Sequence, residues 1–139
     1  MIESLHALLF ALNNLHVSLE GANLETVRVE TVEVIESLST EEIVRVVFRE
    51  SPIMSEIIRC ESGYRQFDSD GDVLRGKVNS KDVGLAQINE AYHLQEAKRL
   101  GLDIYSVEGN LLYAKVLYQK NKTKDWTASR KCWQPFASR

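Results

Sequence analysis

The chain is 139 residues long, 44% of them hydrophobic, and its formal net charge is −3. This length and apolar content fit one globular domain with its own core, and the slightly acidic charge excludes a strongly basic nucleic-acid binder as the default. Two cysteines and three scattered histidines give no metal-ligand spacing, so neither a metal nor a cofactor is predicted.

Residues 1–38 differ in composition from the rest and are predicted to form a separate N-terminal segment. The apolar run at 5–12 is too short to span a bilayer. No Lys or Arg precedes this run and Glu3 does, so an ordinary amphipathic helix is favoured over a signal peptide. In 24–35, valines alternate with charged residues, which indicates a strand or an extended linker. We therefore place the main domain at 39–139.

Two helices are predicted next, each with its own start signal. The stretch Ser39-Thr-Glu-Glu42 has the spacing of a capping box, in which the first and last residues cap each other. The second helix is predicted between Ser51, a capping residue type, and Gly63, which suits the left-handed residue just past a helix end. Pro52 fits the first helical position, where a missing N–H costs no hydrogen bond.

Glu61 lies near the end of this second helix, on its apolar side. It follows Ile57 by four residues and Ile58 by three, so it continues the stripe that these side chains begin. Removal from water raises the pKa of a carboxyl, which makes a buried glutamate a usable general acid near neutral pH. The alternative is a helix-end glutamate that reaches water. Glu61 is the leading candidate for a catalytic residue.

The remaining elements alternate with polar turns. Residues 67–74 are predicted to form two short strands; their alternating aspartates lack the glycine placement and closing glutamate of a calcium loop. Helical patterns cover 90–100, which Gly101 ends, and 107–119. A last short helix is predicted with Asp125 as its cap, and four residues share one of its faces: Trp126, Ser129, Arg130 and Trp133.

Three short motifs occur in order along the chain: Glu61-Ser62, then Gly84-Leu-Ala-Gln-Ile, then Asn110-Leu-Leu-Tyr-Ala. Together they resemble the lysozyme superfamily, and most closely its soluble lytic transglycosylase type of domain, over roughly 43–133. The resemblance implies an α+β fold that is mostly helical, with a small β-hairpin lobe beside the substrate cleft. The family's usual methionine in the second motif is replaced here by alanine.

The resemblance implies cleavage of the β-1,4 bond between N-acetylmuramic acid and N-acetylglucosamine in peptidoglycan glycan strands. Glu61 would protonate the leaving oxygen and then act as base toward the sugar's own 6-hydroxyl, which closes a 1,6-anhydro ring. The substrate's N-acetyl group would stabilise the positive charge, so a second carboxylate is not required. The resemblance also implies substrate contacts by Ser62, Gly84, Gln87, Asn89 and Asn110. Tyr113 and Trp126 are further candidates. The family often has a late Ala-Tyr-Asn segment that reaches the glutamate, but this chain has none, and Trp126 and Trp133 occupy that region instead.

Several of these contacts have a structural alternative. Ser62 can orient Glu61 through a hydrogen bond, or it can close the helix end. Gln87 and Asn89 present amides suited to sugar hydroxyls, although they can also hold the turn in which they lie. Trp126 can stack on a sugar ring, but packing in the core is the commoner fate of such a residue. We expect sugar contact for the two amides and leave Ser62 open.

Asp82 lies two residues before the glycine of the second motif, where animal lysozymes also have an aspartate. A hydrolytic muramidase would use Glu61 and Asp82 as its carboxylate pair. We favour the alternative, in which Asp82 anchors the β-lobe and the enzyme is a transglycosylase. A non-catalytic cell-wall-binding module and a structural component of an envelope or phage machine are further alternatives, against which the presence of Glu61, Ser62 and Gln87 argues.

The two cysteines are expected to lie close together, because Cys60 precedes Glu61 and Cys132 belongs to the last predicted helix. They form a disulfide if the protein is exported, or two buried thiols in a reducing compartment. The implied function places the protein in the cell envelope or outside the cell, as a monomer without a membrane span. Residues 110–139 hold seven basic side chains and one acidic, which indicates either attraction to an anionic wall polymer or a solvated helix surface.

Overall fold

The computed structural model describes residues 38–137, so the N-terminal segment predicted over 1–38 lies outside the described residues except for Leu38. The described part is mostly helical and contains one small antiparallel sheet, which confirms the predicted α+β class at this level. The elements are α3 (Thr40–Val47), α4 (Pro52–Ser62), β1 (Asp82–Val83), β2 (Ile88–Asn89), α5 (Glu90–Arg99), α6 (Val107–Asn121), η1 (Lys124–Ser129), α7 (Arg130–Trp133) and η2 (Gln134–Phe136).

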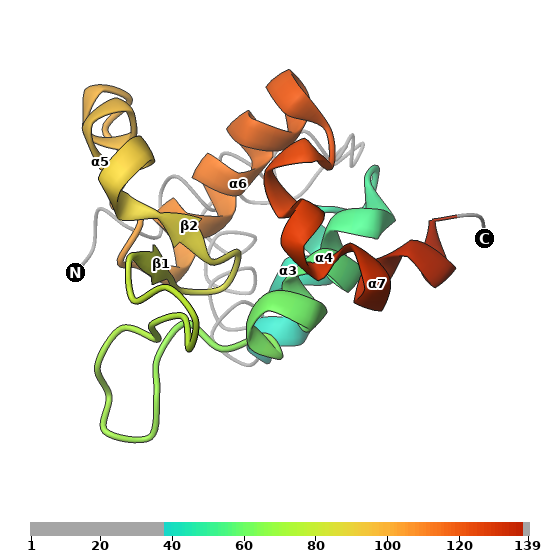
Figure 1. Ribbon diagram of the computed structural model, residues 1–139, viewed down its shortest axis with the longest axis horizontal. Helices are drawn as coiled ribbons and strands as arrows, with labels where there is room; N and C mark the ends of the chain where they lie inside the picture. The colour runs from blue at the N-terminus through green and yellow to red at the C-terminus, as the bar shows by residue number, and fades with distance from the viewer. Residues whose placement is uncertain (1–37, 138–139) are drawn as a thin grey trace, which may run out of the picture.

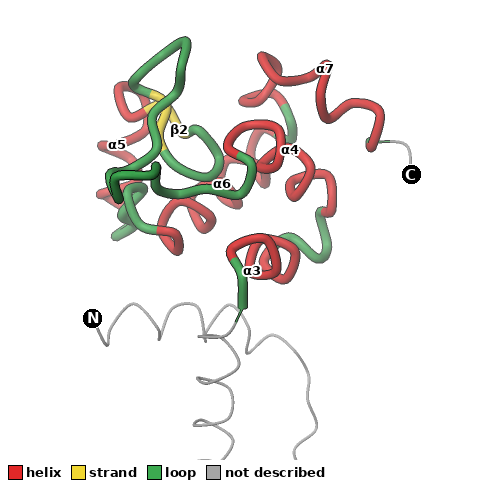
Figure 2. Tube along the Cα trace, turned by 90° about the horizontal axis from the view of Figure 1, so that it is seen from below, coloured by secondary structure: helices red, strands yellow, loops and turns green. Residues whose placement is uncertain are grey.

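The elements divide into two groups around α6. Figure 1 shows the strands and α5 on one side and α3, α4 and α7 on the other, with α6 between them. Figure 2, seen at a right angle to the first view, shows the same division. Helix α4 packs against α3, η1 and α7, so the C-terminal elements return to the helix that ends near Glu61.

In α3 and α4 the helix starts and ends follow the sequence signals with one exception. Ser39 and Glu42 form the predicted capping box at α3, and Pro52 occupies the first turn of α4. Gly63 ends α4 in the left-handed conformation, with φ of 62°, as predicted. The exception is Ser51, whose side chain makes no capping hydrogen bond. Proline at the first turn therefore starts α4 without side-chain help from the residue before it.

The sheet lies later in the chain than the sequence pattern indicated. Strand β1 pairs with β2, whereas the predicted hairpin at 67–74 is reduced to a single bridge between Phe67 and Val73. The turn within it is held by the side chain of Asp68, whose Oδ1 accepts from the backbone N–H groups of Asp70 and Asp72. This carboxylate takes donors that a longer ladder would have used.

The later helices follow the prediction closely, apart from the last one. Helices α5 and α6 match the expected ranges, and Gly101 follows α5 with φ of 72°. The C-terminal stretch is not one capped helix. It is the 3₁₀ segment η1 followed by the short α7, and Asp125 lies inside η1, where its carboxylate accepts a hydrogen bond from Asn121.

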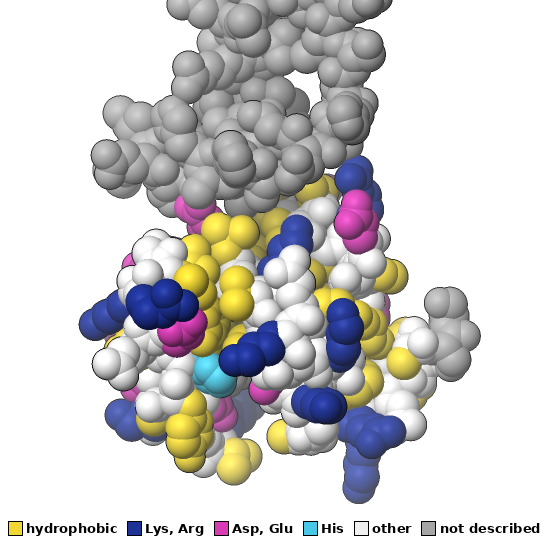
Figure 3. Space-filling model, turned by 90° about the horizontal axis from the view of Figure 1, so that it is seen from above, with side chains coloured by type: hydrophobic (Ala, Val, Ile, Leu, Met, Phe, Trp, Pro, Cys, Tyr) yellow, Lys and Arg dark blue, Asp and Glu magenta, His cyan; other side chains and the backbone are white. Residues whose placement is uncertain are grey.

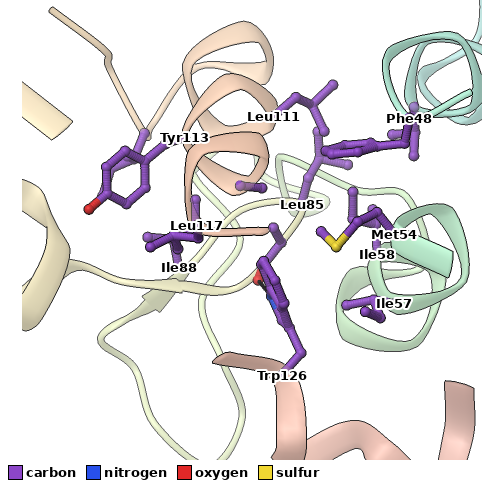
Figure 4. Close-up of a cluster of buried hydrophobic side chains, with 14 of the residues drawn as sticks. Phe48, Met54, Ile57, Ile58, Leu85, Ile88, Leu111, Tyr113, Leu117 and Trp126 are labelled. Atoms are coloured by element: carbon purple, nitrogen blue, oxygen red, sulfur yellow. Dashed lines mark hydrogen bonds between the residues drawn. The ribbon is translucent and has the colours of Figure 1, made fainter. Parts of the chain in front are cut away.

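The hydrophobic core lies where α3, α4 and α6 meet the loop between the two strands. Figure 4 shows Leu85 of this loop between the side chains of α6 and α4, with Trp126 pointing into the same cluster from η1. Leu85 and Ala86 are fully buried, so the loop is itself part of the core. Its backbone therefore needs hydrogen-bond partners inside the protein.

Two buried amide side chains supply those partners. Asn110 accepts from the backbone N–H of Ala86 at 2.9 Å and donates to the carbonyl oxygens of Val83 and Ile104 at 3.0 and 2.8 Å. Gln66 accepts from the N–H of Leu85 at 2.9 Å. The side chains of Asn110 and Gln66 lie so close to Gly84 that no side chain fits at that position. A Cβ at Gly84, which also has φ of 70°, would lie 2.4 Å from Gln66 Oε1 and 2.6 Å from Asn110 Nδ2.

The two cysteines form a disulfide, with their Cα atoms 6.0 Å apart, and the prediction of their proximity is confirmed. Cys60 lies on α4 and Cys132 on α7, so the bond joins the C-terminal elements to the helix that bears Glu61. It closes a loop with a sequence separation of 72 residues. Such a crosslink restricts the unfolded chain strongly because the loop is long.

The uneven charge of the sequence does not appear as one basic patch on the face drawn in Figure 3. Lys and Arg side chains are scattered there, with Asp and Glu between them. This face therefore resembles a solvated surface rather than a polyanion site. Within residues 38–137, no helix has the length and apolar content needed to cross a bilayer.

Replacing Asn110 by alanine is expected to destabilise the fold by about 3 kcal/mol or more, because the buried N–H of Ala86 and the C=O of Val83 lose their partner. Urea unfolding would measure the loss. Asn121→Ala, near the end of the same helix, removes a bond to the exposed Asp125 and should change stability by about 0.5 kcal/mol or less. Equal effects of the two substitutions would contradict the structural role of Asn110.

Reduction of the disulfide is expected to lower the free energy of unfolding by about 4 kcal/mol in the chain-entropy model. Urea titrations with and without a thiol reductant would measure it. The double variant Cys60→Ala/Cys132→Ala is the control, because the reductant should leave its midpoint unchanged. A wild-type midpoint that also stayed unchanged, with reduction verified by thiol labelling, would contradict the prediction.

Candidate active site

Glu61 is half-buried in the last turn of α4, on the same side of the helix as the buried Ile57 and Ile58. Burial raises the pKa of the Glu61 carboxyl above its ordinary value of 4.5. A hydrogen bond from Ser129 opposes this rise in pKa, and the negative charge of Asp82 adds to it. The environment thus favours the protonated acid, as the sequence position predicted.

The side chain that contacts Glu61 comes from the far end of the chain. Ser129 Oγ donates to Glu61 Oε1 at 2.6 Å, and it also lies 3.2 Å from the carbonyl oxygen of Trp126. Sequence reasoning placed Ser129 only on a face of the last helix. The signal that could have revealed this contact is the cysteine pair, since Cys60 adjoins Glu61 and Cys132 lies one helical turn after Ser129.

Asp82 is held by two amide side chains of the strand region. Its Oδ1 accepts from Asn89 Nδ2 at 2.7 Å and from Asn79 Nδ2 at 3.3 Å. These are the side-chain bonds expected of an anchor of the β-lobe. Asp82 nevertheless lies near enough to Glu61 for its charge to raise the pKa of that carboxyl. Asp82 thus interacts electrostatically with Glu61, and its own hydrogen bonds are structural.

The two amides expected to bind sugar are both used to hold the local backbone. Gln87 Nε2 donates to the carbonyl oxygen of Gly84 at 2.9 Å, and Gln87 itself has a positive φ of 48°. Asn89 caps α5 by accepting from the N–H of Ala91, while its Nδ2 bonds to Asp82. Asn89 is thus committed at both ends. Gln87 is half-buried, and its Oε1 makes no hydrogen bond within the described residues.

Four other expected substrate contacts lie inside the protein. Ser62 is 4% exposed and does not bond to Glu61, because its hydroxyl donates to the carbonyl of Ile58 and accepts from the N–H of Arg65. Tyr113 is 1% exposed, and its hydroxyl lies 3.2 Å from His93 Nδ1. Figure 4 shows this hydroxyl pointing away from the other labelled side chains. Buried Gly84 and Asn110 have the structural roles described above.

Trp126 is a core residue that positions the site and does not offer an open ring face. It is 3% exposed, and its Nε1 donates to the carbonyl oxygen of Ala86 at 2.9 Å. Trp133 donates from its own Nε1 to the carbonyl oxygen of Trp126 at 3.0 Å. This series of bonds ties η1 to the loop between the strands. Of the two roles considered for Trp126, the structure shows the commoner one, packing in the core.

The arrangement suits proton transfer by one carboxyl. Residues 38–137 contain no group of three or more His, Cys, Asp or Glu side chains placed to hold a metal ion.

No protein-family model, curated protein or solved structure matches the chain. The chemistry of the site therefore has to be inferred from Glu61 and its surroundings. A half-buried acid with a raised pKa and a single hydroxyl donor fits a general acid that later acts as a base.

The substitution Glu61→Gln is expected to make the protein more stable than the wild type at pH 8, with a smaller difference at pH 4. Because the folded pKa of Glu61 is raised, the native state holds its proton longer than the unfolded state does. The wild type therefore loses stability as pH rises from about 4.5 through the folded pKa. Urea unfolding of both proteins at the two pH values would measure this difference.

The substitution Glu42→Gln provides a control of opposite sign. Hydrogen bonds from the side chain and backbone of Ser39 lower the pKa of the Glu42 carboxyl. The wild type should therefore gain stability over Glu42→Gln as pH rises through the window below 4.5. A Glu61 variant that became relatively less stable from pH 4 to pH 8 would contradict the assigned environment of that carboxyl.

Proposed function

We propose that this chain is a lysozyme-like lytic transglycosylase, which cleaves the β-1,4 bond between N-acetylmuramic acid and N-acetylglucosamine in peptidoglycan. The observation that carries the proposal is the half-buried Glu61, whose pKa is raised by burial and which receives a hydroxyl hydrogen bond from Ser129. No Lys or Arg of the described residues pairs with it. A raised pKa favours the protonated form of the carboxyl, which can give its proton to a glycosidic oxygen as that oxygen leaves.

The reaction proceeds in two steps that use the same carboxyl. Glu61 gives its proton to the bridging oxygen as the bond to C1 of N-acetylmuramic acid breaks, and the sugar's N-acetyl oxygen bonds to C1. The Glu61 carboxylate then takes the proton of the 6-hydroxyl, whose oxygen attacks C1 and displaces the N-acetyl oxygen. The product is a 1,6-anhydro sugar, and Glu61 is protonated again for the next cycle.

The bonds of Asp82 favour this reaction over hydrolysis by a carboxylate pair. Asp82 Oδ1 is engaged by Asn89 and Asn79, which suits an anchor better than a nucleophile or a base. Its negative charge raises the pKa of Glu61 and so supports the acid from a distance. Of the amides expected to bind sugar, Gln87 is the one whose Oε1 is left to accept from a sugar hydroxyl.

The proposed place of action is the cell envelope or the outside of the cell. The disulfide between Cys60 and Cys132 supports an oxidising compartment, where such bonds persist. Peptidoglycan strands are the proposed partner, and the enzyme is proposed to act as a monomer. The proposal includes no cofactor and no nucleic acid.

Incubation of the protein with purified peptidoglycan sacculi tests the proposal. We expect turbidity to fall, and mass spectrometry to show muropeptides lighter by one water than reducing-end products. Glu61→Gln should lower the rate by at least about three orders of magnitude, because the variant has no proton to give. A folded Glu61→Gln protein that kept a tenth of the wild-type rate would overturn the mechanism.

Asp82→Asn is the matched control, since asparagine retains an acceptor oxygen for Asn89 and Asn79. We expect its rate to stay within about tenfold of the wild type, because Asp82 acts on Glu61 only through its charge. If the released muropeptides all had reducing ends, and Asp82→Asn lost activity as severely as Glu61→Gln, the protein would be a hydrolytic muramidase. No release at all would leave a wall-binding module.

A further inference from the structure

We propose that Ser129 is a positioning residue for Glu61: its hydroxyl holds Oε1 of the carboxyl, so that the catalytic proton resides on Oε2. The inference deepens the proposed function and rests on it. The hydroxyl has one proton and two acceptors within reach, Glu61 Oε1 at 2.6 Å and the carbonyl oxygen of Trp126 at 3.2 Å, and the proton is assigned to the shorter contact, to Glu61. A donor at one carboxyl oxygen leaves the proton of the neutral acid to the other oxygen.

The hydroxyl keeps the same role through the proposed cycle. While Glu61 is protonated on Oε2, its Oε1 is a carbonyl-type oxygen that accepts from Ser129. After Oε2 has given its proton away, Oε1 is part of a carboxylate and accepts the same bond more strongly. Ser129 thus does not have to turn between the two steps. It stabilises the charge that develops on Glu61, and it keeps the carboxyl in one orientation.

Ser129 can serve as a fixed point because both sides of it are anchored. On the N-terminal side, Trp126 bonds through Nε1 to the carbonyl oxygen of Ala86, which lies in the buried loop between the strands. On the C-terminal side, the disulfide joins Cys132 to Cys60, the residue next to Glu61. The disulfide therefore keeps the segment that carries Ser129 close to Glu61.

The groups around Glu61 explain why its hydrogen-bond donor is uncharged. From β1, Asp82 presents a negative charge that raises the pKa of Glu61. Arg130 and Lys131 of α7 are exposed, and Arg59 of α4 is paired with Glu56. A cation in the place of Ser129 would lower the pKa of the acid strongly and remove its proton. A hydroxyl opposes the effect of burial on the pKa without reversing it.

The experiment compares the wild type with Ser129→Ala, Ser129→Thr and Thr127→Ala. Thr127 is an exposed hydroxyl residue in the same η1 segment and serves as the control. The titration of the Glu61 carboxyl is followed by NMR of ¹³C-labelled glutamate in the free, folded protein. The kcat and KM are measured across pH on soluble, uncrosslinked glycan strands.

Loss of the hydroxyl in Ser129→Ala should move the Glu61 titration to higher pH, because burial then acts unopposed. The alkaline limb of the kcat profile should move in the same direction. We expect kcat at its optimum to fall about tenfold or more, as for a lost hydrogen bond to a charged group, with KM within about twofold. Ser129→Thr should show the wild-type titration and rate, and the control Thr127→Ala should leave both unchanged.

A folded Ser129→Ala protein whose Glu61 titrates as in the wild type would overturn the inference, and so would a Ser129→Thr variant that fails to restore the titration. If Ser129→Ala does not fold, Ser129→Cys keeps nearly the same size with a weaker donor and should shift the titration in the same direction. The two proposals fail separately. A titration shift in a wild-type protein that cuts no glycan refutes the proposed function and leaves the contact between Ser129 and Glu61 standing.

Discussion

The buried amide of Asn110 is the interaction on which the rest of the domain depends. Two of its three hydrogen bonds tie α6 to β1 and to the loop after it, through Val83 and Ala86, and the third holds Ile104 in the segment before α6. The loop after β1 provides Leu85 and Ala86 to the core. A backbone segment can enter a hydrophobic core only if its N–H and C=O groups find partners there. Because Asn110 and Gln66 provide them, the strands and the helices form one body rather than two loosely joined parts.

The packing of these elements also explains how the half-buried carboxyl of Glu61 is accommodated. Glu61 emerges at the end of α4 among apolar side chains, where ionisation is disfavoured. The neutral hydroxyl of Ser129, from a distant segment of the chain, donates a hydrogen bond to this carboxyl. The nearby disulfide and Trp126 hold the segment that carries Ser129. A cationic partner would instead lower the pKa of Glu61 and so disfavour the protonated form that the proposed general-acid role requires.

Several motif residues make structural hydrogen bonds within the protein. Asn110, Asn89 and Ser62 stand in the short sequences that resemble the transglycosylase pattern, and each uses its side chain to bond to the protein's own backbone or to Asp82. Polar residues in a motif can serve either purpose, and their chemistry does not distinguish the two. At Asn110 and Ser62, burial does distinguish them, because a buried polar side chain must be satisfied from within.

The sequence by itself determined the helix boundaries, such as the Ser39 capping box and the Gly63 end of α4, and it determined the place of Glu61 on an apolar face. These features depend on residues within one or two turns of each other, so local spacing is enough to predict them. Only the tertiary structure decided that Ser129, rather than the neighbouring Ser62, contacts Glu61, and that the sheet forms around the Asn110 contacts. Contacts between residues far apart in the chain depend on how the core packs as a whole, which no local pattern encodes.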